Sequence, residues 1–211
     1  MITVAKGVKG LIFDCDGTLA DTMPIHLAAW SATFAARGIS CPPEFIKQVT
    51  GMPAEKIIDE FNRRYNHKID PRAFAAEKNR RARLRLEEAL PIQPVVDIVL
   101  QHRNLLPMAV ASGGTRENVL LTLDSIGLTN CFETVLTADD PVAPKPDPHI
   151  FLEAARRMRV EPALCQVFED GAPGIEAARR AGMIATDVRV IIIDQPSALL
   201  GRLSKFDSST S

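Results

Sequence analysis

Residues 10–18 read GLIFDCDGT, in which four residues without charge are followed at once by two aspartates with a cysteine between them, then a glycine and a threonine. A short apolar run that stops abruptly at charge is typical of a buried parallel strand. Gly17 gives the chain the freedom to turn just past that strand. We therefore expect Asp14 and Asp16 to lie together at the carboxyl end of a first strand.

Further short apolar runs follow along the chain, and helical patterns lie between them. The runs cover residues 107–111, 133–136, 165–168 and 183–186, and the helical patterns cover residues 92–103, 115–126, 148–158 and 174–181. This alternation predicts an α/β fold, with a doubly wound, Rossmann-like parallel sheet and helices on both of its faces.

One long stretch, residues 23–90, breaks the alternation. Its pattern is helical throughout, with Pro24 in a first helical turn, a charged helix over residues 71–90, and no predicted strand. A helical insertion directly after the first strand would cover the carboxyl edge of the sheet. We therefore expect a helical cap over residues 21–90 and a core built from residues 1–20 and 91–211.

Polar residues follow several of the predicted strands. In open α/β sheets, ligands bind outside the carboxyl ends of the strands, so these side chains are expected on one edge. Besides Asp14 and Asp16, the predicted edge carries a serine with two glycines, one lysine and an acidic pair: Ser112, Gly113, Gly114, Lys145, Glu169 and Asp170.

This set of side chains indicates phosphoryl-transfer chemistry. Four carboxylates on one edge would repel each other unless a cation lay among them, and oxygen ligands beside phosphate select Mg²⁺. The lysine and the Ser-Gly-Gly amides can neutralise phosphoryl oxygens. Asp14 can then attack phosphorus to form an aspartyl-phosphate, while Asp16 exchanges protons with the leaving oxygen and with water.

Four motifs in order resemble those of the haloacid dehalogenase-like (HAD) hydrolase superfamily. They are residues 14–19 (DCDGTL), Ser112 within 110–114 (VASGG), Lys145 within 145–148 (KPDP) and residues 168–175 (FEDGAPGI). The resemblance spans residues 10–187. Within the superfamily the chain is similar to the β-phosphoglucomutase-like branch, whose small helical cap follows the first motif, here at residues 21–26 (DTMPIH) with Trp30 beyond.

The resemblance implies roles for the matched residues. Asp14 would be nucleophile and metal ligand, and Asp16 the acid/base and a metal ligand through its backbone carbonyl. Ser112 and Lys145 would bind phosphate and act in catalysis, and Asp170 would hold Mg²⁺. Glu169 would either share the metal site directly or support it. Substrate-binding positions are expected at Gly17, Thr22, His26, Gly51, Lys78, Gly113 and Gly114, with Thr22 at the hinge between core and cap.

A cap loop separates two outcomes for the phosphoenzyme. The β-phosphoglucomutases carry an arginine there that grips a second phosphate, whereas residues 51–54 read GMPA and place Ala54 at that position. This favours a phosphatase over a phosphomutase. The same loop and residues 167–170 (VFED) resemble bacterial fructose-1-phosphate phosphatases, so the expected substrate is a small sugar phosphate, with fructose-1-phosphate first.

Simpler explanations exist for several of these residues. Asp14 and Asp16 could only form a turn, Ser112 could only cap a helix, and Lys145 could be a solvated loop lysine. His26, four residues before Trp30, could be a packed core histidine. Cys15 is expected to be an apolar strand residue. Arginines 80, 81, 83 and 85 are expected to cover a solvated helix face.

A non-catalytic binding protein is the third functional alternative, although the sequence retains the nucleophile, the acid and the lysine.

Composition narrows the remaining choices. The net charge of −1 argues against a nucleic-acid protein. No apolar run reaches the ~18–20 residues that span a bilayer. The four cysteines are widely spaced and no secretory leader pattern precedes the first strand, which predicts a reduced, cytoplasmic protein. We expect a monomer whose partner is a small phosphorylated sugar, with no nucleic acid and no membrane.

Overall fold

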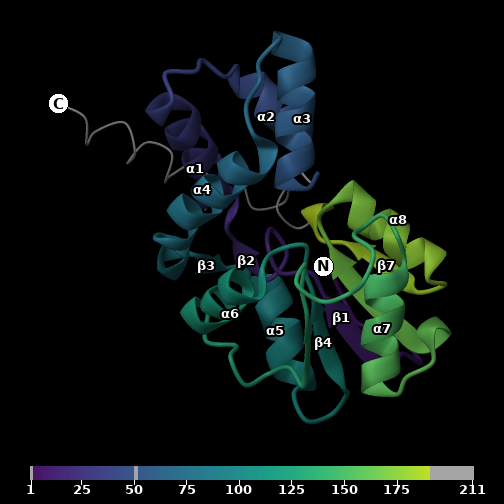
Figure 1. The fold of residues 1–211 in the computed structure, drawn as a ribbon. Coiled ribbons are helices and arrows are strands. Elements are labelled where there is room, and N and C mark those ends of the chain that lie inside the picture. Colours follow the sequence, from purple (N-terminus) through teal and green to yellow (C-terminus); the bar gives the residue numbers. More distant parts are fainter. Residues whose placement is uncertain (1, 50–51, 191–211) are drawn as a thin grey trace.

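The centre of the protein is a five-stranded parallel sheet (Figure 1). The structure is a computed structural model that describes residues 2–49 and 52–190. The strand order is β5-β4-β1-β6-β7, with β1 in the middle. The predicted α/β class and its parallel sheet are confirmed. The strands are β1 (Gly10–Phe13), β4 (Met108–Ala111), β5 (Thr134–Leu136), β6 (Cys165–Glu169) and β7 (Ile184–Asp187).

Helices cover both faces of the sheet, and the side chains of β1, which point alternately to the two faces, contact them on each side. Leu11 and Phe13 belong to an apolar cluster with α5 (Gln93–His102) and α6 (Arg116–Ser125). Ile12 belongs to a second cluster on the other face, with α7 (His149–Met158) and α8 (Ala172–Arg180). Both faces are therefore apolar, which explains the uninterrupted apolar runs of these strands.

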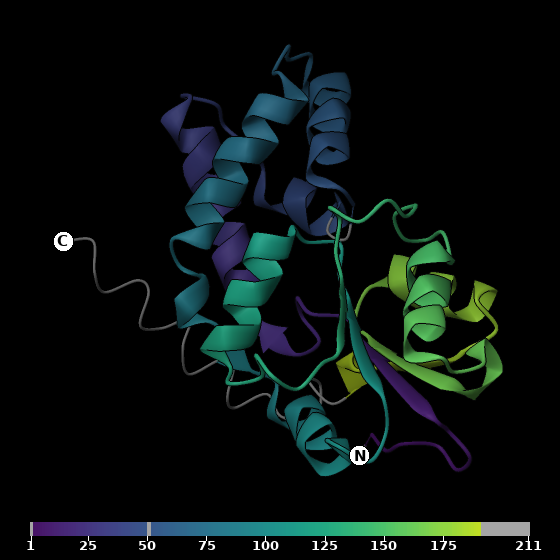
Figure 2. The same cartoon turned by 60° about the horizontal axis from the view of Figure 1, so that its bottom comes forward.

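A separate group of helices lies on one side of the sheet (Figure 2). These are α1 (Met23–Ala36), α2 (Pro43–Val49), α3 (Ala54–Tyr65) and α4 (Pro71–Arg83). Asp70 fixes the start of α4, because its carboxylate accepts a hydrogen bond from Ala73 N. The four helices share an apolar cluster of their own, rich in aromatic rings, whose buried members include Trp30, Phe34, Phe45, Phe61 and Phe74.

The end of the helical stretch differs from the prediction. The helix expected over residues 71–90 ends at Arg83, and a 3-10 helix (Leu86–Glu88) and strand β3 (Leu90–Pro91) follow. β3 pairs antiparallel with β2 (Ala20–Asp21), and neither strand was predicted. Burial of Leu86 turns the chain back toward β2, a tertiary contact that overrides local helix propensity.

The β2–β3 pair places both junctions of the helical stretch side by side. The division into a cap of residues 21–90 and a core stays a prediction, and residues 191–211 of that core lie outside the described part.

A second 3-10 helix covers Pro162–Leu164. Across residues 2–49 and 52–190, no helix combines the length and the apolar character that crossing a membrane requires.

Candidate active site

The turn after β1 brings the first and fourth motifs together. Asp14 N donates a hydrogen bond to Phe168 O, so the chain leaves β1 directly beside the end of β6. Gly17 has a φ of 81°, and a Cβ added to it would lie 2.3 Å from Oδ2 of Asp170. Both the backbone conformation and the missing side chain of Gly17 are therefore needed for Asp170 to approach the Asp14–Thr18 turn.

Lys145 joins two of the carboxylates. Its Nζ lies 2.6 Å from Oδ1 of Asp14 and 2.8 Å from Oε1 of Glu169. Burial alone would lower the pKa of Lys145, but these two carboxylates outweigh it and raise the pKa, so Lys145 is a cation. Lys145 is thus bound within the site and is not a solvated loop lysine.

The fourth motif supplies two acids with different surroundings. Both oxygens of Glu169 are engaged, Oε1 by Lys145 and Oε2 by the backbone N–H of Gly171. Asp170 accepts a hydrogen bond from Oγ1 of Thr18 at 3.2 Å. Burial, together with the negative charge of Glu169, raises the pKa of Asp170 to about 6. Glu169 is therefore held by donors of the protein itself. Among the described residues, no lysine or arginine donates a hydrogen bond to Asp170.

The charge balance of this group fits a divalent cation. Burial raises the pKa of Asp14 well above its usual range, and the charges of Glu169 and Asp170 add to the effect. Lys145 offsets only one of three carboxylates. Within the described residues, no group of three or more His, Cys, Asp or Glu side chains is arranged to hold a metal. Mg²⁺ usually takes one or two carboxylates, with water and substrate phosphate as further ligands, so Asp14 and Asp170 suffice.

The loop after β4 lies against the same turn. Ser112 is 1% exposed, and its N–H donates to Leu136 O while its Oγ accepts from Gly114 N at 3.0 Å. A Cβ on Gly114 would lie 3.4 Å from Oδ2 of Asp16, so this loop runs beside Asp16. Gly113 is exposed, with nothing within 4 Å of where a Cβ would be. The described hydrogen bonds use the amides of Ser112 and Gly114, so the groups that this loop can present to an anion at this edge are the Ser112 hydroxyl and the N–H of Gly113.

Asp16 is connected to helices α1 and α4 through its other oxygen. Oδ1 accepts a hydrogen bond from Oγ1 of Thr22 at 2.7 Å and lies 3.4 Å from Nε2 of His26. Nζ of Lys78 lies 3.0 Å from Nδ1 of His26. Burial would raise the pKa of Asp16, but the hydrogen bond and charge of His26 and the hydrogen bond from Thr22 lower it to about 2. Asp16 is therefore ionised in this arrangement.

Lys78 differs from the arginines near it in sequence, Arg81 and Arg83 on α4 and Arg85 beyond its end. Its side chain is buried, with Nζ 5.4 Å from the centre of the Trp30 ring, and burial lowers its pKa to about 8. Arg81, Arg83 and Arg85 instead form ion pairs at partly exposed positions, with Glu77, Glu117 and Glu88.

Most of the predicted site residues are brought together. Thr22 is fully buried and its hydroxyl is occupied by Asp16, and His26 bridges Asp16 and Lys78. Gly51 lies outside the described residues. The sequence motif assigns no role to Thr18, although its place directly after Gly17 could have suggested the contact with Asp170. Cys15 is buried in the apolar cluster of the α5 face.

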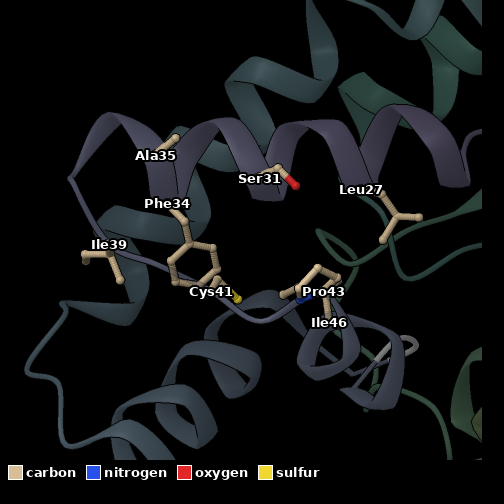
Figure 3. Close-up of a pocket in the computed structure, with 8 residues that line it drawn as sticks. All are labelled: Leu27, Ser31, Phe34, Ala35, Ile39, Cys41, Pro43 and Ile46. Atoms are coloured by element: carbon tan, nitrogen blue, oxygen red, sulfur yellow. The ribbon is translucent and has the colours of Figure 1, made fainter. Parts of the chain in front are cut away.

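A cavity of about 260 Å³ lies between α1 and the segment that leads into α2 (Figure 3). Most of its wall is apolar, including Leu27, Phe34 and Ile46, and Ser31 contributes a hydroxyl. None of the motif residues lines it. We therefore do not count this cavity as part of the active site.

Known proteins that resemble this chain in sequence are hydrolases and phosphatases, in agreement with the residues found at the site. The family model of haloacid dehalogenase-like hydrolases matches residues 8–182. The fructose-1-phosphate phosphatase YqaB of Escherichia coli is 38% identical over 182 residues, covering 86% of this chain and 97% of the relative. The phosphorylated carbohydrates phosphatase of Thermotoga maritima is 26% identical and covers 83% of this chain and 82% of its own.

A solved structure extends the comparison to the fold. The β-phosphoglucomutase of Clostridium difficile superposes with a TM-score of 0.73 at 25% identity, covering 85% of this chain and 84% of that one. The matched region of the family model contains every motif described above. With four motifs meeting at one edge of a parallel sheet, this protein belongs to the haloacid dehalogenase-like hydrolases.

Proposed function

We propose that this protein is a phosphatase that hydrolyses small sugar phosphates through a phosphoenzyme on Asp14. The observation that carries the proposal is the position of Lys145, whose Nζ contacts Asp14 and Glu169 at 2.6 and 2.8 Å. A lysine held at the nucleophile can neutralise a transferring phosphoryl group there. Relatives named as phosphatases of fructose-1-phosphate and of phosphorylated carbohydrates support the substrate class.

In the first step, a carboxylate oxygen of Asp14 attacks phosphorus and the bond from phosphorus to the sugar oxygen breaks. The departing oxygen takes a proton from Asp16. Oδ2 of Asp16 faces the Ser112–Gly114 loop, whereas Oδ1 is occupied by Thr22 and His26, so Oδ2 would carry that proton. Ser112 and Lys145 would hold the phosphoryl oxygens during transfer.

In the second step, water attacks phosphorus and the bond between phosphorus and Asp14 breaks, which frees orthophosphate and the carboxylate. Asp16 accepts the proton of the water. The low pKa of Asp16, about 2, favours the ionised form that this step needs. Protonation for the first step requires that contact with substrate loosen the hydrogen bonds from Thr22 and His26.

The metal proposed for this site is Mg²⁺. Asp14, Asp170 and the backbone carbonyl of Asp16 would hold it, and Glu169 would act by fixing Lys145. Bound Mg²⁺ would supply positive charge that offsets the buried carboxylates and the substrate phosphate. The raised pKa values of Asp14 and Asp170 support a cation at this place.

Fructose-1-phosphate is the substrate that we place first, on the similarity to the Escherichia coli enzyme. A phosphomutase is the alternative, and the likeness to β-phosphoglucomutase concerns the fold. Ala54 begins α3 and has no group that could grip the second phosphate of a bisphosphate. A cytoplasmic location stays a prediction, supported by the four free cysteines.

The test is phosphate release from a panel of sugar phosphates with and without Mg²⁺. We expect Mg²⁺-dependent release, fastest from fructose-1-phosphate, and a loss of about 10³-fold or more in Asp14→Asn. Asp97→Asn, at an exposed position on α5, is the matched control and should keep full activity. Retained activity in Asp14→Asn would overturn the mechanism, and conversion of a hexose-1-phosphate into its 6-phosphate would support the mutase.

A further inference from the structure

The two phosphate-binding elements of the site are held by different kinds of contact. β4, which leads to Ser112, has neighbours on both sides, whereas β5, which leads toward Lys145, is an edge strand of three residues. An edge strand is held by one ladder of hydrogen bonds only. The eight residues between Leu136 and Lys145 therefore depend on contacts outside the strand ladder for their position.

One carboxylate in that segment collects contacts from both faces of the sheet. Oδ2 of Asp140 accepts hydrogen bonds from N (2.9 Å) and Oγ1 (3.1 Å) of Thr137 and from Nη2 of Arg116 (3.0 Å). Oδ1 accepts from Nη2 of Arg157 at 3.3 Å. Arg116 begins α6 and Arg157 lies on α7, and these helices cover opposite faces (Figure 1).

The same segment is bonded to the loop that carries Ser112. Ala138 N donates to Gly114 O at 2.9 Å, and the N–H of Arg116 donates to Oδ2 of Asp139 at 2.8 Å. The Arg116 side chain also donates to Val135 O at 3.0 Å. Arg116, the second residue after Gly114, is thereby tied to the Lys145 segment through both its backbone and its side chain.

Asp140 is well placed to act as the junction of these contacts. Its side chain is 10% exposed, whereas those of Arg116 and Arg157 are 44% and 36% exposed, so solvent reaches these two ion pairs from the arginine side. Burial would raise the pKa of Asp140, but hydrogen bonds from Thr137 and the contact with Arg116 lower it. The carboxylate is therefore ionised at neutral pH, and its hydrogen bonds with Arg116 and Arg157 join opposite charges.

From this arrangement we infer that Asp140 is a positioning residue, which sets the placement of Lys145 relative to Ser112 and so shapes the site for one phosphoryl group. Asp140 acts through its neighbours and does not itself touch substrate. The inference rests on the proposed function, because it takes the anion bound at this site to be a phosphoryl group.

The test measures orthophosphate binding by calorimetry in the presence of Mg²⁺, on folded full-length protein. We expect Asp140→Asn to weaken orthophosphate binding about tenfold and to lower kcat by a similar factor, because both steps need Ser112 and Lys145 in register. Arg116→Met should have a similar effect. The double variant should be no worse than either single variant, because both remove the same junction.

Asp124→Asn is the matched control. Asp124 is an exposed acid on α6 that also accepts a hydrogen bond from a threonine, Thr129, and its loss should leave orthophosphate binding within twofold. If Asp140→Asn lowers the thermal midpoint but binds orthophosphate as the parent does, Asp140 is only structural and the inference is wrong. Additive losses in the double variant would also overturn it.

These measurements separate the inference from the proposed function. A parent protein that releases no phosphate from any sugar phosphate, yet loses orthophosphate affinity in Asp140→Asn, would refute the phosphatase and support the positioning role. An active phosphatase whose orthophosphate affinity is unchanged in Asp140→Asn would support the proposed function and refute the positioning role.

Discussion

Lys78 on α4 places its Nζ 3.0 Å from Nδ1 of His26 on α1, and His26 in turn faces Asp16. An ammonium can only donate, so where His26 is neutral it accepts at Nδ1 and its ring proton sits on Nε2, the nitrogen that faces the carboxylate. Helices α1 and α4 therefore influence the hydrogen bonding of the proposed acid/base. The contact also has a cost, because the charge on Lys78 is buried.

That cost predicts a pH-dependent stability. The pKa of Lys78 is lowered from 10.5 to about 8 by burial, so the unfolded chain binds the proton more tightly than the folded protein does. Stability from this group is present above pH 10.5 and is lost as the pH falls through about 8. Lys78→Met should therefore raise the free energy of unfolding at pH 7 by about 3 kcal/mol, an advantage that fades between pH 8 and 10.5.

The measurement is urea unfolding of Lys78→Met and its parent at pH 7 and pH 10. Lys56→Met, on the exposed surface of α3, is the matched control and should show no such trend. A difference in unfolding free energy between Lys78→Met and its parent that stays constant over this pH range would contradict a lowered pKa of the buried Lys78.

Gly17 tests whether the approach of Asp170 depends on a missing side chain. Gly17→Ala combines a φ of 81° with a Cβ 2.3 Å from Oδ2 of Asp170. Gly7→Ala has a similar φ of 87° with nothing within 4 Å, so it isolates the backbone strain. We expect Gly7→Ala to cost about 1 kcal/mol and to keep full activity.

Gly17→Ala should cost more than Gly7→Ala and should lower kcat by about 10²-fold, because it displaces Asp170. The readouts are thermal unfolding and phosphate release at saturating Mg²⁺. Equal effects of the two alanines on activity would show that the close contact between Gly17 and Asp170 is not needed for catalysis.

The two acids of the fourth motif should respond differently to substitution. Asp170→Asn should raise the Mg²⁺ concentration needed for half-maximal phosphate release by about tenfold or more, because it removes a proposed ligand. Glu169→Gln should lower kcat with a much smaller change in Mg²⁺ requirement, because Glu169 holds Lys145 through Oε1. Titration of chelator-treated protein with Mg²⁺ separates the two cases, and equal shifts would make Glu169 a direct ligand.

Ala54 should decide how the protein handles a second phosphate. Ala54→Arg introduces a bidentate donor at the start of α3, so a hexose bisphosphate should inhibit phosphate release about tenfold more strongly. Ala54→Gln, which has no guanidinium, is the control and should not change the inhibition. Inhibition that is the same in all three proteins would mean that this position does not face a second phosphate.

Local patterns were enough to predict the parallel sheet and the edge on which Asp14, Ser112, Lys145 and Asp170 meet. Parallel strands all end at the same edge, so the order of strands and polar residues along the chain determines which side chains converge. The helix from residue 71 was predicted for the same kind of reason, since Asp70 and Pro71 are local signals of a helix start. Its end at Arg83 was not, because burial of Leu86 is a long-range event.

The partners within the site were decided by tertiary structure. Glu169 was an open choice between metal ligand and support. It pairs with the Gly171 N–H through the β6–α8 turn, and with Lys145 from the segment that follows β5. The chain from Asp14 to Asp170 specified which chemical groups reach the edge. Which donor faces Oδ1 of Asp16 depended on how α1 and α4 bring His26 and Lys78 together, since contacts between residues far apart leave no periodic pattern in the sequence.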